Sequence, residues 1–176
     1  MSERFPDLVD PIHLAVTGRR VSGELQPAQM PRLLAMLYSD KGSINVDMEF
    51  GIDGQGIRYV AGHLAADMEL VCQRCLESVG FVVNTDFKLG MVTSDTQIEK
   101  LPGGYEPLLV KNVPMALTDI IEDELILSIP IVATHAEDEC DVAVQKVLKG
   151  SQETGSAKAR KSPFAVLEEL KVKTKD

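Results

Sequence analysis

Three successive segments of this chain alternate apolar and polar side chains, and this pattern limits the fold more than any other feature. In the first segment, residues 44–52, every second side chain is apolar: Ile44, Val46, Met48, Phe50 and Ile52. Residues 57–71 and 79–89 repeat the alternation. Because successive side chains of a β-strand point to opposite faces, each segment is predicted to be a strand with one buried face. The glycines of residues 53–56 favour a hairpin turn between the first two, so the strands should form an antiparallel meander.

Helical patterns lie on both sides of these strands. Residues 27–38 begin with proline and carry apolar side chains at helical spacing, which predicts one helix. A second helix is predicted to begin near residues 118–119 and to end before Pro130. Residues 12–16 and 20–25 are weaker candidates for short strands. The expected fold class is α+β, an antiparallel β-meander with two or three packed helices and a C-terminal helical tail.

The composition fits a soluble globular protein. The chain has 176 residues, of which 44% are hydrophobic, so it can bury a core without disulfides. No apolar run approaches the roughly 18–20 residues that span a bilayer. The N-terminus lacks the basic and apolar segments of a secretory signal. Three cysteines are too few, and odd in number, for a secreted disulfide scaffold. We therefore expect a cytoplasmic protein.

The charge is distributed unevenly along the chain. The net charge is −9, but residues 1–144 hold 10 basic and 23 acidic side chains, whereas residues 145–176 hold 8 basic and 4 acidic ones. An acidic body repels phosphate, so it favours a basic protein partner over broad binding of nucleic acid. The alternative is that the acidic surface only keeps the protein soluble.

The sequence predicts three parts: an α+β body over residues 1–148, a flexible linker over 149–161, and a short C-terminal helix over 162–173. The predicted helix carries an apolar stripe of candidate partner-binding residues, Phe164, Leu167 and Leu170. A helix this short needs a surface to pack against. Either its own body or a partner would provide that surface, and the flanking lysines and arginines would add attraction to RNA.

The cysteines suggest a metal site. Cys72 and Cys75 have the Cys-x-x-Cys spacing of a zinc knuckle and fall on the turn between two predicted strands. His135 and Cys140 are the remaining soft ligands, so a Cys3His zinc site would close a loop of about 60 residues. Two alternatives remain open. One is a thiol redox pair, which is normally activated at a helix N-terminus, and the other is a set of uncoordinated thiols.

The second predicted helix begins with a group of acidic residues, which are candidate contacts for a basic partner: Asp119, Glu122, Asp123 and Glu124. Acids in the first turns of a helix also stabilise its dipole, which is the simpler interpretation. No glycine-rich phosphate loop or Ser-His-Asp arrangement is present, and the histidines are scattered. The sequence therefore predicts a protein that is not an enzyme.

Three motifs occur in the order typical of the YceD family: residues 71–77 around the cysteines, the acidic helix at 119–130, and His135 with Cys140. Residues 162–167 also resemble the end of those proteins. The resemblance implies a role in the synthesis, processing or accumulation of large-subunit (23S) ribosomal RNA, and the missing catalytic motifs predict that this role is non-enzymatic. Combined with the charge, it suggests an adaptor for a ribosomal or assembly protein, with ribosomal RNA contacted mainly through the basic tail. A direct RNA-binding or RNA-processing factor and a zinc-knuckle or thiol redox protein are the alternatives.

Overall fold

The computed structural model describes residues 5–136 and 139–140. The chain forms two compact units, Met1–Glu139 and Cys140–Asp176, and the strands and helices of the described residues all belong to the first. The predicted linker and C-terminal helix, including Phe164, Leu167 and Leu170, lie outside the described residues.

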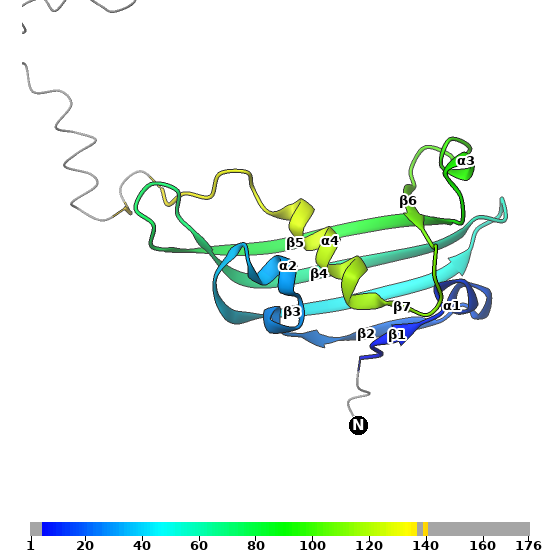
Figure 1. Cartoon of the computed structure of the whole chain (residues 1–176), viewed down its shortest axis with the longest axis horizontal. Coiled ribbons are helices and arrows are strands. Elements are labelled where there is room, and N and C mark those ends of the chain that lie inside the picture. Colours follow the sequence, from blue (N-terminus) through cyan, green and yellow to red (C-terminus); the bar gives the residue numbers. More distant parts are fainter. Residues whose placement is uncertain (1–4, 137–138, 141–176) are drawn as a thin grey trace, which may run out of the picture. The chain divides into compact units, whose positions relative to one another are not determined.

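A twisted five-stranded sheet is the framework of this unit (Figure 1). Its order is β2-β3-β4-β5-β6, with these bounds: β2 Arg20–Leu25, β3 Leu37–Ile52, β4 Arg58–Val71, β5 Ser78–Val92 and β6 Glu106–Leu109. Strands β2 to β5 are antiparallel neighbours, which confirms the predicted meander. Strand β6 was not predicted. It pairs parallel to β5 after a crossover that contains the short helix α3, Asp95–Ile98.

One face of the sheet is buried, as the alternation predicts. Ile44, Met48 and Phe50 on β3 are at most 1% exposed. Helix α4, Leu117–Ser128, packs in the same core through Ile120, Ile121 and Leu125. The α+β fold class is therefore confirmed. The polar side chains of the alternating positions lie on the opposite face and are largely exposed.

Two predicted elements near the N-terminus had different outcomes. The strand expected at residues 20–25 is β2, whereas residues 12–16 belong to helix α1, Pro11–Thr17, so the strand predicted there was wrong. Asp10 accepts a hydrogen bond from the backbone N–H of His13, and Gly18 ends the helix in the left-handed conformation at φ 59°. A short apolar run does not distinguish strand from helix, and these two caps decide the outcome.

The predicted helix over residues 27–38 is divided. Pro27–Gln29 form a 3-10 turn, η1, and Pro31–Leu34 form helix α2. Pro31 has no backbone N–H, so it starts a new helical turn instead of continuing the first. Strand β3 then begins at Leu37.

A second, two-stranded sheet joins distant parts of the chain. Strand β1, Leu8–Val9, pairs antiparallel with β7, Met115–Ala116, which leads directly into α4. Helix α4 starts within two residues of the predicted position and ends two residues before Pro130. Within the described ranges, no helix has the length and apolar character required to cross a membrane.

Candidate metal centre

The turn between β4 and β5 carries the cysteine pair, as predicted. The backbone N–H of Cys72 donates to the carbonyl of Glu77 at 2.9 Å, and that of Leu76 donates to the carbonyl of Cys72 at 2.9 Å. Leu76 has φ +65°, a left-handed conformation that a leucine rarely adopts, although its side chain is 69% exposed. This tight turn brings the two cysteines to one side. The strained backbone of Leu76 indicates that the surrounding contacts hold the turn in this geometry.

The segment that follows α4 lies against this turn. The backbone N–H of Gln73 donates to the carbonyl of Ala133 at 2.9 Å. The guanidinium of Arg74, which stands between the two cysteines, donates to the carbonyls of His135 and Ala136. These hydrogen bonds hold His135 beside the cysteine turn, although the two are distant in sequence.

The four sequence-predicted ligands, Cys72, Cys75, His135 and Cys140, come together. One donor atom from each lies within 4.8 Å of the others. The sulfur of Cys75 is 3.4 Å from Nδ1 of His135, and Nε2 of the same imidazole donates to the carbonyl of Ser78 at 2.9 Å. With the proton on Nε2, Nδ1 keeps its lone pair directed at the sulfurs.

This donor set fits zinc. Zinc bonds of about 2.3 Å to sulfur and about 2.0 Å to nitrogen place tetrahedral ligand atoms roughly 3.5 Å apart. Because the donor atoms lie within 4.8 Å of one another, they need to close by at most about 1.3 Å. Cys72 and Cys140 are buried, whereas Cys75 and His135 are partly exposed. The cluster could hold a metal ion, and a Cys3His set is typical of structural zinc sites.

The surroundings of Cys72 favour the thiolate form of its side chain. Burial opposes its ionisation, but hydrogen bonds from the backbone N–H groups of Cys75, His135 and Arg74, and from the Cys75 side chain, outweigh this effect. The net effect of burial and these hydrogen bonds is to lower the pKa of Cys72 from 9.0 to about 5. The thiolate is the form that binds metals.

The acidic residues of α4 have different environments. Glu122 is 3% exposed, and its carboxylate accepts hydrogen bonds from the backbone N–H groups of Arg32 (2.6 Å) and Leu33 (2.9 Å). Arg32 also pairs through its guanidinium with Glu122 at 2.8 Å and with Asp123 at 2.6 Å. Glu122 therefore fastens α2 to α4.

The remaining two acidic residues of the predicted partner surface are less engaged. Asp119 is exposed, and its backbone carbonyl accepts a hydrogen bond from Arg32 at 3.4 Å. Glu124 is partly exposed. Their role in binding a partner remains a prediction.

Sequence reasoning missed the groups that support the candidate ligands. Ser78 acts through its backbone carbonyl, which leaves no trace in the residue type. The position of Arg74 between the two cysteines was a usable signal, because a long donor in such a turn can reach backbone carbonyls beside it.

The fold and the site define a small α+β protein in which a cysteine turn and a distant Cys/His pair could share one ion. A family model described as "Large ribosomal RNA subunit accumulation protein YceD" matches residues 60–171, which include all four candidate ligands. The curated Large ribosomal RNA subunit accumulation protein YceD of Haemophilus influenzae is 32% identical over 171 residues, covering 97% of this chain and 98% of its own length. The chain therefore belongs to the YceD family. No solved structure matches it.

Proposed function

We propose that this chain supports the accumulation of large-subunit ribosomal RNA in the cytoplasm, without catalysing a reaction on that RNA. The observation that carries the proposal is the near full-length similarity to a relative whose name states this role. Because the similarity extends over both the sheet and the cysteine cluster, it supports one role for the whole chain.

A deletion strain complemented with the intact chain tests the proposal. We expect the strain without the chain to lose 23S relative to 16S ribosomal RNA and to show a reduced large-subunit peak in a sucrose gradient. Expression of the chain should restore both. An unchanged ratio of the two RNAs in the deletion strain would contradict the role.

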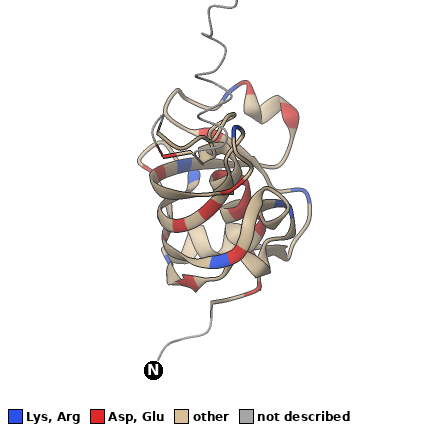
Figure 2. Cartoon of the chain, turned by 90° about the vertical axis from the view of Figure 1, so that its left-hand side faces the viewer, with Lys and Arg blue, Asp and Glu red and all other residues tan. Residues whose placement is uncertain are grey.

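We further propose that the chain acts as an adaptor that binds a basic ribosomal or assembly protein. The excess of acidic over basic side chains in residues 1–144 supports this mode. Figure 2 shows acidic positions distributed over several strands and helices, with fewer basic ones among them. Such a surface attracts cationic proteins and repels phosphate.

The alternative is a direct RNA-binding or RNA-processing factor, for which RNA and not a protein is the main partner. A filter-binding titration of the purified chain with 23S fragments distinguishes the two modes. Direct binding requires affinity that falls steeply with salt, because cationic side chains release counterions from the phosphates. The adaptor mode predicts only weak RNA affinity, from the basic tail, when the partner is absent. It also predicts nuclease-resistant recovery of the partner from lysate.

We also propose that Cys72, Cys75, His135 and Cys140 hold one structural zinc ion. The converging donors and the low pKa of Cys72 support this assignment. A redox role fits less well, because Cys72 is fully buried and lies on a β-turn rather than at a helix N-terminus. Elemental analysis of chain purified without chelator should find close to one zinc per molecule. Absence of stoichiometric metal would contradict the proposal.

A further inference from the structure

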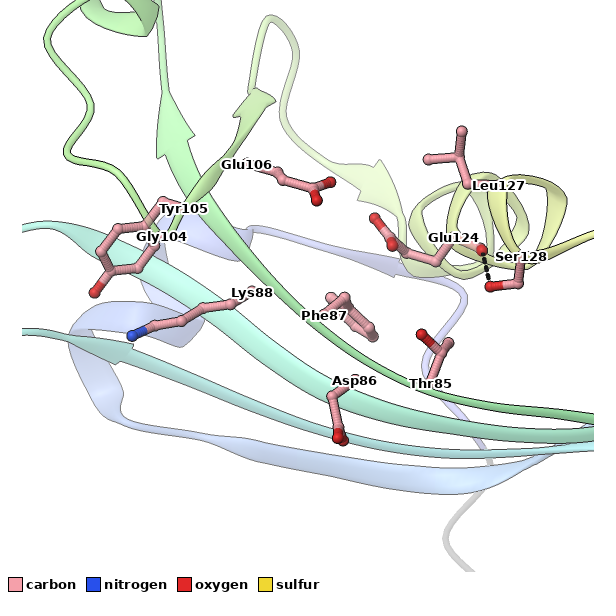
Figure 3. A pocket seen from close by; sticks show the side chains of 10 residues that line it. All are labelled: Thr85, Asp86, Phe87, Lys88, Gly104, Tyr105, Glu106, Glu124, Leu127 and Ser128. Carbon is pink, nitrogen blue, oxygen red and sulfur yellow. Dashed lines mark hydrogen bonds between the residues drawn. The ribbon is translucent and has the colours of Figure 1, made fainter.

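A hollow of about 470 Å³ lies between α4, β5 and β6 (Figure 3). Its volume is in the range of ligand-binding sites, and it is open to solvent. The walls come from the middle of β5, the start of β6 and the last two turns of α4.

Two carboxylates face each other across this hollow. Glu106 on β6 and Glu124 on α4 point toward one another from opposite walls (Figure 3). Burial, together with the nearby carboxylates of Glu106 and Asp123, raises the pKa of Glu124. In the described part of the chain, no ion pair joins Glu106 or Glu124 to a cation. The hollow therefore carries negative charge that no ion pair among the described residues compensates.

Lys88, which also lines the hollow, is engaged by aromatic rings and not by the two glutamates. The Nζ atom of Lys88 lies 4.4 Å from the ring centroid of Tyr105 and 5.5 Å from that of Tyr59. Tyr105 is fixed in turn by a 2.8 Å hydrogen bond from its hydroxyl to Asp53. Figure 3 shows the ammonium of Lys88 directed away from both glutamates. Lys88 is thus held by aromatic rings and does not neutralise the pair.

Apolar groups complete the lining. Phe87 is 7% exposed and contributes to the wall formed by β5, while Leu127 on α4 is 74% exposed at the rim. A long cationic side chain matches this combination, because its methylene stem packs on apolar surface while its charged head meets carboxylates. A guanidinium suits two carboxylates better than an ammonium does, because its five donors lie in one plane.

We propose that this hollow binds an arginine side chain presented by the basic protein partner. The inference rests on the proposed adaptor function and names the place where the partner docks. Of the acidic residues of α4, the proposal assigns only Glu124 to partner binding. It adds Glu106, which no sequence pattern indicated.

Fluorescence anisotropy with a labelled arginine–glycine peptide and the full chain tests the proposal without RNA. The double variant Glu106→Gln/Glu124→Gln should bind the peptide about tenfold more weakly than the unaltered chain. Removing two facing carboxylates relieves repulsion, so the variant should fold, which its thermal unfolding curve checks.

The matched control is Glu24→Gln/Asp67→Asn, which removes the same charge from exposed positions on the open face of the sheet. Its affinity for the peptide should stay within about twofold. Equal loss in both variants would mean that the peptide recognises net charge only, and the proposal would be overturned. A lysine–glycine peptide that binds as tightly as the arginine one would also contradict it.

The chain's own basic segment is the competing occupant. Neutralisation of Lys158, Arg160 and Lys161 to glutamine should leave the affinity for the peptide unchanged. An increase of about tenfold would show that this segment already fills the hollow, and it would overturn docking of a partner there. Because the assay contains no RNA, failure of the peptide to bind leaves the ribosomal RNA role standing, and that role is decided by the deletion strain.

Discussion

The imidazole of His135 donates from Nε2 to the backbone carbonyl of Ser78 over 2.9 Å. Ser78 is the first residue of β5, so the sheet itself fixes the tautomer and orientation of a ligand that lies 57 residues away in sequence. This relationship makes the metal assignment testable residue by residue.

His135→Ala should abolish stoichiometric zinc, because three sulfurs cannot complete the Cys3His set. His63→Ala is the matched control, since that histidine pairs with Asp86 on the exposed face of the sheet. Elemental analysis of both variants, purified in parallel, measures the effect. Full zinc content in His135→Ala would remove the histidine from the site.

Cys72→Ser should eliminate a thiol that titrates near pH 5 in metal-free protein, as followed by the ultraviolet absorbance of the thiolate. The folded pKa of Cys72 is lower than 9.0, so the thiolate contribution to stability is complete above pH 9 and is lost as the pH falls toward 5. The melting temperature of protein freed of metal by a chelator should therefore decrease as the pH falls from 9 to 5. A melting temperature with the same pH dependence in Cys72→Ser would contradict the assignment.

Leu76→Gly should stabilise the chain by roughly 1 kcal/mol, because glycine adopts the left-handed conformation of this turn without strain. The melting temperature should rise by a few degrees. Val82→Gly is the control: Val82 is 72% exposed but lies within β5, so the same substitution should destabilise there. A lower melting temperature for Leu76→Gly would show that its side chain has a packing role.

Glu122→Ala should destabilise the chain by about 3 kcal/mol in urea denaturation, because it leaves two backbone N–H groups and one guanidinium without their buried carboxylate. Asp123→Ala removes the exposed partner of the same Arg32 and should cost less than about 1 kcal/mol. Similar losses in the two variants would contradict the distinct role of Glu122.

The long strands could be predicted from the sequence, because their alternation records burial on one face. Short elements left no such record. Strand β6 has four residues, and β1 and β7 have two each, so no period can be read from them. Helix α1 is stabilised by its caps, Asp10 and Gly18, and its apolar residues alone suggested a strand.

The four candidate ligands could be predicted because cysteine and histidine are rare and chemically distinctive. The support from Ser78 could not, because a backbone carbonyl is common to every residue type. Glu122 showed the opposite problem. Its residue type suggested a surface contact, whereas α2, some 90 residues earlier, supplies its partners.

The pairing of Leu8 with Ala116 has a consequence for the time at which this protein can mature. Strand β1 can pair with β7 only after residues 115–116 have been synthesised. The contact of Glu122 with α2 forms later still. The meander can assemble as it emerges, but the layer that covers it closes only after Ala116 and Glu122 have also been synthesised.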